Sequence, residues 1–115
     1  MNQGIKTVIY PVKDIGRAKA TFTKLLGVQP DSDQPYYVGF TLGGQQIGLD
    51  PNGHSRGMSG PVGYYHVDDI KGSVQSLVDA GGQVEQEPTD VGGGRLIANV
   101  KDADGNAIGL LQDPS

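Results

Sequence analysis

Apolar residues near the start of the chain first alternate and then recur at helical spacing. Residues 5–12 are rich in β-branched and aromatic side chains, which favours a strand. Asp14 then offers an N-cap, and Gly27 stands where a left-handed residue commonly follows a helix. The apolar residues between them that follow the helical repeat are Ile15, Ala18, Phe22, Leu25 and Leu26. The pattern predicts a strand followed by a helix that ends at Gly27.

The next apolar runs are short and separated by turn residues. Residues 36–42 and 45–50 read as two strands, and Gly43-Gly44 between them fits a two-residue hairpin turn. A weaker strand is predicted around residues 28–31. Residues 51–60 are rich in turn-forming residues and have no apolar period, so they are predicted to connect two halves of the chain.

The second half repeats this order. Residues 62–67 form a predicted strand, Asp69 is a potential N-cap, and Gly81-Gly82 closes the predicted helix. The apolar residues of that helix are Ile70, Val74, Leu77 and Val78. The three strands predicted after it are residues 83–87, 95–101 and 107–112. Asp104-Gly105 lies between the last two strands and predicts a type I′ hairpin turn.

The two halves match by residue type as well as by element order. Val12-Lys13-Asp14-Ile15 is repeated as Val67-Asp68-Asp69-Ile70, about 55 positions later. The predicted fold class is therefore α+β, with two βαβββ modules in one chain that form a curled mixed sheet around a cavity. We expect one domain over residues 1–115, with module 1 at about 1–51, a linker at about 52–60 and module 2 at about 61–115.

Composition narrows the class of protein further. A chain of 115 residues has the length of one ordinary domain, and without cysteine it can form neither disulfides nor thiolate metal sites. The net charge is −4, and the basic residues are scattered, which argues against nucleic acid as a partner. No apolar run approaches the roughly 20 residues that span a bilayer, and the start does not resemble a signal peptide. We therefore expect a cytoplasmic protein that does not bind membranes.

The repeated V-x-D-I motif and the hairpin Asp102-Ala103-Asp104-Gly105-Asn106-Ala107-Ile108-Gly109-Leu110 carry a family resemblance. Together they resemble the vicinal oxygen chelate superfamily, of the glyoxalase/bleomycin resistance protein/dioxygenase type. The likeness covers nearly the whole chain. Ala103 replaces a proline of the family's hairpin pattern, and Thr21-Phe22 stands where the family often has Phe-Tyr.

The resemblance implies four metal-ligand positions, two in each module, each usually a His or Glu. In this chain they are Thr7, Gly48, Val62 and Gly109. None of these residues supplies an imidazole or a carboxylate, so we expect no metal site and no cofactor. Shifting the second position to Asp50 would leave the other three without a ligand. The two glycines are expected to leave empty volume where a metal would otherwise lie.

The remaining candidates for recognition are aromatic and titratable. Tyr64 and His66 share one face of their predicted strand, opposite Val67, which is expected to pack under the second helix. His66 is open to three interpretations: ligand contact, general acid–base catalysis or a structural hydrogen bond. A metal site built from His54, His66 and Asp50 is improbable, because His54 lies in the turn-rich connection.

The tyrosines supply flat aromatic surface with a polar tip, which suits an organic ligand. Tyr36 shares this character, Arg95 is a candidate partner for an anionic group, and residues 92–94 (Gly-Gly-Gly) are interpreted as a flap over the cavity. The predicted ligand-binding residues are Thr7, Tyr37, Gly48, Tyr64, His66, Arg95 and Gly109, with His66 the one candidate for catalysis.

The favoured function is metal-free binding of a small organic molecule, similar in mode to drug sequestration by bleomycin resistance proteins. The alternative is a lyase or isomerase that works by acid–base chemistry without metal. A third possibility is a module used only for dimerisation or partner contact. The resemblance also implies a homodimer.

Overall fold

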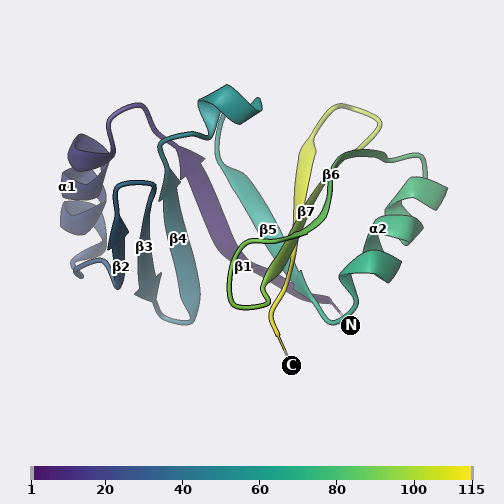
Figure 1. Ribbon diagram of the computed structural model, residues 1–115, viewed down its shortest axis with the longest axis horizontal. Coiled ribbons are helices and arrows are strands. Elements are labelled where there is room, and N and C mark those ends of the chain that lie inside the picture. Colours follow the sequence, from purple (N-terminus) through teal and green to yellow (C-terminus); the bar gives the residue numbers. More distant parts are fainter. Residues whose placement is uncertain (1, 115) are drawn as a thin grey trace. The chain divides into compact units, whose positions relative to one another are not determined.

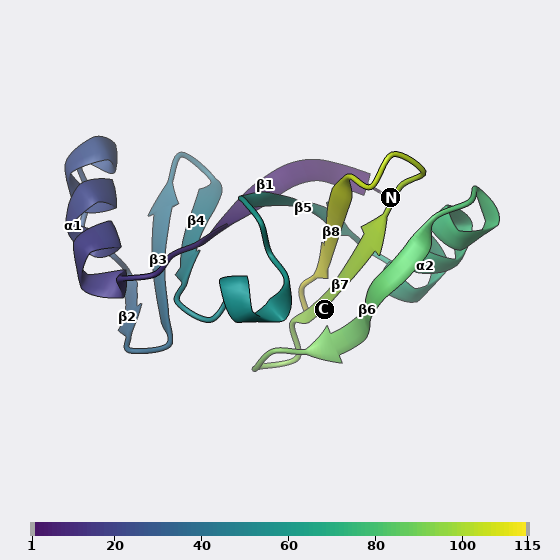
Figure 2. The same cartoon turned by 90° about the horizontal axis from the view of Figure 1, so that it is seen from above.

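A computed structural model describes residues 2–114 of the chain. Its contacts form two compact units, one of residues 6–62 and one of residues 63–114 together with residues 2–5. We call them the first unit and the second unit. Each has its own helix, its own hydrophobic core and its own run of neighbouring strands (Figures 1 and 2).

The first unit holds one βαβββ module. Its elements are β1 (Asn2–Pro11), α1 (Ile15–Leu26), β2 (Ser32–Gln34), β3 (Tyr37–Leu42) and β4 (Gln45–Asp50), followed by the short 3-10 helix η1 (His54–Arg56). The strand order is β2-β3-β4-β1, and β1 runs parallel to β4 while the other pairs are antiparallel. The first four described residues of β1 group with the second unit.

The second unit repeats this arrangement. Its elements are β5 (Val62–Val67), α2 (Ile70–Asp79), β6 (Gln83–Asp90), β7 (Leu96–Lys101) and β8 (Ala107–Gln112). The strand order is β5-β8-β7-β6, with β5 parallel to β8 and the other pairs antiparallel. Position by position this is the topology of the first unit, so the predicted α+β class and the repeat of two βαβββ modules are confirmed.

Each helix begins and ends as the sequence predicts. The carboxylate of Asp14 accepts a hydrogen bond from the backbone N–H of Arg17, and that of Asp69 accepts one from Gly72, so each caps its helix. Gly27 closes α1 at a φ of +72°, which only glycine adopts at little cost.

Each helix covers one face of its strands with apolar side chains. In the first unit α1 packs on Val38, Phe40 and Leu49, which are almost fully buried. In the second unit α2 contributes Ile70 and Val74 to a core that also contains Val67 of β5. Because side chains alternate along a strand, the neighbouring positions face away from the helices. Those positions include most of the predicted site residues.

Two strand predictions are corrected by the structure. The weak strand expected at residues 28–31 is displaced to β2, which begins after Pro30, because proline has no N–H to donate to the ladder. Asp31 makes the first backbone hydrogen bond of this stretch, to the carbonyl of Gly39. The strand expected at residues 83–87 extends to Asp90, and its register shifts between Gln86 and Thr89, around Pro88.

Of the two predicted hairpin turns, the first has the expected backbone angles and the second does not. Gly43 and Gly44 both have positive φ, as the predicted two-residue turn requires. The type I′ turn predicted at Asp104-Gly105 is wrong, because such a turn needs positive φ at both residues, and Gly105 has a φ of +83° whereas Asp104 does not have a positive φ. Instead, Gly105 donates to the carbonyl of Asp102, and the Asp102 side chain accepts from the backbone of Asp104 and Asn106. This side chain holds the loop in a different, longer turn.

Candidate functional site

The first unit places Tyr37 flat over two glycines on the face opposite α1. Gly39 on β3 and Gly48 on β4 are direct partners across the strands. A Cβ added to Gly48 would lie 2.2 Å from the hydroxyl oxygen of Tyr37, and one added to Gly39 would lie 3.1 Å from its ring. The ring therefore occupies the space that a side chain at Gly48 would need.

The second unit also places a tyrosine, Tyr64, over a glycine, Gly109. Tyr64 on β5 and Gly109 on β8 are direct partners, and Tyr64 is only 3% exposed. A Cβ added to Gly109 would lie 2.6–2.8 Å from Cδ2, Cγ and Cε2 of the tyrosine ring. The expectation that Gly48 and Gly109 leave empty volume is therefore wrong, because an aromatic ring of the same unit fills each position.

The strand face predicted for His66 is confirmed. Val67 lies in the core beneath α2, and Tyr65 packs against the same core. Tyr64 and His66 alternate with them and are buried on the opposite side of β5.

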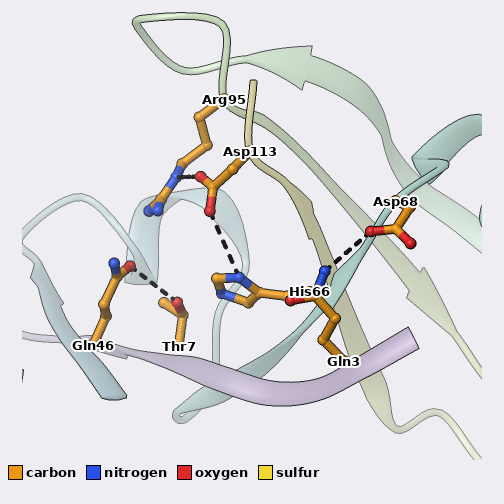
Figure 3. A network of polar contacts seen from close by, with 7 residues as sticks. All are labelled: Gln3, Thr7, Gln46, His66, Asp68, Arg95 and Asp113. Atoms are coloured by element: carbon orange, nitrogen blue, oxygen red, sulfur yellow. Dashed lines mark hydrogen bonds and ion pairs between the residues drawn. The ribbon is translucent and has the colours of Figure 1, made fainter. Parts of the chain in front are cut away.

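His66 contacts a carboxylate that sequence reasoning missed. Its Nδ1 lies 3.7 Å from Oδ2 of Asp113, in the segment after β8, and the other carboxylate oxygen of Asp113 accepts a 2.7 Å hydrogen bond from Nε of Arg95 (Figure 3). The His66 side chain is 10% exposed, whereas that of Asp113 is 49% exposed. Asp113 thus joins two predicted site residues that lie far apart in the sequence.

Arg95 is presented by a tight loop of three glycines. Gly92, Gly93 and Gly94 all have positive φ, Val91 donates to the carbonyl of Arg95, and Arg95 donates to the carbonyl of Gly92. The segment interpreted as a flap is thus a hydrogen-bonded turn between β6 and β7. It directs the Arg95 side chain toward Asp113 (Figure 3).

Thr7 is engaged within the first unit. It is 1% exposed, and its hydroxyl donates to the side-chain oxygen of Gln46, its direct partner on β4, at 3.2 Å (Figure 3). Gln46 was not predicted as a site residue, and its place opposite Thr7 depends on a strand register that the sequence does not state.

Asp50 and His54 have local roles in the connection after β4. The Asp50 carboxylate forms an ion pair with Arg56 and accepts a hydrogen bond from the backbone of Asn52, which ties η1 to the end of β4. His54 is exposed at the start of η1, and Tyr36 is 65% exposed.

The four positions that correspond to family metal ligands do not fit a metal ion. Thr7 is hydrogen-bonded to Gln46, Val62 is a buried apolar residue, and the two glycines lie under tyrosine rings. Within residues 2–114, no group of three or more His, Cys, Asp or Glu side chains is arranged to hold a metal. The donor set therefore lacks the imidazoles and carboxylates that divalent metals prefer in such sites.

Over the same described residues, neither helix has the length and apolar character that crossing a membrane would require.

Comparison with solved structures shows the fold. A glyoxalase/bleomycin resistance protein/dioxygenase superfamily member from Vibrio splendidus 12B01 matches with a TM-score of 0.71 and 20% identity, over 99% of this chain and 100% of that chain. Methylmalonyl-CoA epimerase from Mycobacterium tuberculosis matches with a TM-score of 0.71 and 18% identity, over 99% and 90%. The Mn(II)-bound glyoxalase from Novosphingobium aromaticivorans matches with a TM-score of 0.72 and 20% identity, over 98% and 40%.

Two sequence comparisons gave different results, and one of them identifies the family. No sequence among curated proteins gives a significant match. The family model of the Glyoxalase/Bleomycin resistance protein/Dioxygenase superfamily matches residues 4–110, which is nearly the whole chain. The chain therefore belongs to the glyoxalase/bleomycin resistance protein/dioxygenase superfamily.

Proposed function

We propose that this protein binds a small organic molecule without a resident metal ion. The observation that carries the proposal is that two of the four positions implied as metal ligands are Gly48 and Gly109, each covered by a tyrosine side chain of its own unit. Aromatic rings and a few fixed polar groups suit organic ligands, whereas they do not suit divalent metals. The proposed contacts are Thr7, Tyr37, Gly48, Tyr64, His66, Arg95 and Gly109.

The mode of action that we propose is sequestration, in which the ligand is held and released unchanged. Apolar contact and stacking would supply most of the affinity, and polar groups would orient the ligand. We further propose that the protein acts in the cytoplasm as a homodimer. Bleomycin resistance proteins are named in the matched family and offer the nearest parallel for such a role.

Two measurements test this proposal together. Elemental analysis after incubation with Zn²⁺, Ni²⁺, Co²⁺ or Mn²⁺ and gel filtration should find far less than one metal ion per chain. Native mass spectrometry of the protein from its own host should find a small organic molecule that dissociates on denaturation. A stoichiometric metal held by protein atoms would overturn the metal-free proposal, and a chain that never carries an organic molecule would overturn the binding proposal.

The Asp113 carboxylate beside Nδ1 of His66 favours one second candidate, a metal-independent lyase or isomerase. A carboxylate near Nδ1 can orient an imidazole so that its other nitrogen exchanges protons with a substrate. His66→Gln distinguishes the two functions. A binding protein should keep affinity within about tenfold, whereas an enzyme should lose turnover by about 10²–10⁴-fold, the usual contribution of general acid–base catalysis.

A further inference from the structure

The second unit contains two side chains that bear N–H groups, Arg95 and His66, and these two donors converge on one carboxylate, Arg95 by a hydrogen bond and His66 through a longer contact. Nε of Arg95 and Nδ1 of His66 contact different oxygens of Asp113, at 2.7 and 3.7 Å (Figure 3). The donors are held from two sides, His66 on β5 and Arg95 by the glycine turn before β7. The guanidinium of Arg95 is always charged, so it presents positive charge at this point.

The carboxylate is more exposed than the two donors. The side chains of His66 and Arg95 are 10% and 29% exposed, whereas that of Asp113 is 49% exposed. Asp113 follows the last residue of β8 and lies outside the strand ladder. A residue in this position can leave the donors with little disturbance of the sheet.

We propose that His66 and Arg95 form a binding site for the carboxylate of a small organic acid, and that Asp113 occupies this site from within the chain. An incoming carboxylate replaces the carboxylate of Asp113 on the same two donors. This inference rests on the proposed binding function and adds the chemical class of the ligand.

The size of the affinity gain expected when Asp113 is removed depends on how often Asp113 occupies the site. An internal carboxylate acts as a competitor at high effective concentration, and the apparent affinity for an outside ligand falls by the fraction of time that the site is vacant. If Asp113 is away from His66 and Arg95 about a tenth of the time, its removal strengthens carboxylate binding about tenfold.

The test uses sodium benzoate as probe and the side-chain NMR signals of histidine as readout. The chain has two histidines, so exposed His54 serves as an internal reference for His66. Benzoate is titrated at constant ionic strength into the unaltered protein and into Asp113→Ala. We expect the His66 signals to shift in both, with an apparent Kd about tenfold lower in Asp113→Ala.

Matched variants separate the site from general charge effects. Asp104→Ala changes the net charge equally, and Asp104 lies in the turn at the other end of the β7–β8 hairpin from Arg95 and Asp113, so it should leave the Kd unchanged. Arg95→Gln combined with Asp113→Ala should abolish the gain. Benzamide, the neutral analogue of benzoate, should bind no better to Asp113→Ala than to the unaltered protein.

Equal benzoate affinity in Asp113→Ala and Asp104→Ala, or equal gains for benzamide and benzoate, would overturn the inference. Binding of neutral organic molecules without selectivity for benzoate would leave the proposed binding function standing while this inference fails. Melting temperatures and backbone amide spectra of each variant establish that a lost response is not lost folding.

Discussion

Two tyrosines lie over glycines in this protein, but different atoms of the two tyrosine side chains lie nearest to the glycines. At Gly109 the nearest atoms include Cγ of Tyr64, the atom where the ring joins the side chain. At Gly48 the nearest atom is the hydroxyl oxygen of Tyr37, at the far end of the side chain. Cγ of a buried side chain moves only if χ1 changes, which close packing of the whole ring opposes, whereas the end of a partly exposed side chain can shift more easily.

Alanine at the two glycines should therefore have unequal costs. Gly109→Ala should lower the free energy of unfolding by about 2 kcal/mol, as overpacking in a buried site usually does. Gly48→Ala should cost less than half of that, because the Tyr37 hydroxyl can shift. Urea denaturation monitored by circular dichroism measures both values.

Gly60 is the matched control for this pair, since a Cβ added there meets nothing within 4 Å. Gly60→Ala should change stability by less than about 0.5 kcal/mol. Combining Gly109→Ala with Tyr64→Ala should cost less than the two single changes added together. Equal costs at Gly48 and Gly109, or additive costs in the double variant, would contradict the packing described here.

At the scale of the element, the turn between β7 and β8 depends on one side chain. The Asp102 carboxylate accepts hydrogen bonds from the backbone of Asp104 and Asn106 and from the side-chain amide of Asn106. The side-chain bond from Asn106, followed by the backbone bonds, holds the pKa of Asp102 below its ordinary value of 3.8. These bonds favour the ionised form, because a protonated carboxyl group accepts them less well.

The sign of the pH dependence follows from that lowered pKa. The stability that Asp102 contributes is present above the ordinary pKa of an unfolded aspartate, about 3.9, and is lost as pH falls through the lower folded value. Asn106→Ala should raise the pKa of Asp102 toward the ordinary value. Carboxyl-carbon NMR titration measures the change, with Asn52→Ala as the control because Asn52 lies in the other unit. A pKa unchanged by Asn106→Ala would refute this account of the turn.

The two helix N-caps give a second prediction at this scale. Asp14→Ala and Asp69→Ala should each lower the free energy of unfolding by about 1 kcal/mol, because each removes the acceptor for an N–H in the first turn. Asp69→Asn is the control, since asparagine caps about as well as aspartate. Thermal unfolding that separates Asp69→Ala from Asp69→Asn supports capping. Equal losses in both variants would assign the effect to charge instead.

Elements were predicted well where one local signal decides them, and less well elsewhere. Helix starts at Asp14 and Asp69 follow from capping chemistry that acts within one turn. The type of the β7–β8 turn was wrong because the Asp102 side chain outweighs the preference of the Asp104-Gly105 pair. The place of β2 depends on Pro30 and on pairing with β3, which the local pattern does not reveal.

At the scale of the whole molecule, the repeat was visible in the sequence but the contents of the site were not. The V-x-D-I motif and the element order predicted two modules, and the structure has two units of the same topology. The contact of Asp113 with His66 and the seating of Tyr37 on Gly48 join residues through strand pairing and side-chain rotamers. Such pairings are set by the packing of distant segments, so residue spacing alone could not supply them.

The lack of suitable metal donors also gives a prediction for the whole molecule. EDTA should leave the melting temperature unchanged, and saturating Zn²⁺, Ni²⁺ or Mn²⁺ should not raise it. A ligand that binds only the native state stabilises it by about 4 kcal/mol at 1,000 times its Kd, so differential scanning calorimetry would detect a specific metal. A saturable rise in melting temperature that EDTA reverses would contradict the proposed metal independence.

The first strand has a consequence for any attempt to divide this protein. Residues 7–11 of β1 pair with β4, whereas the first described residues of the same strand group with residues 63–114. We therefore expect that cutting the chain near η1, by a protease or by design, does not give two fragments that fold alone. The second fragment would lack the first residues of β1, which belong to its unit. Two fragments divided near η1 should therefore accumulate only when they are expressed together, so the two units are not two separable proteins.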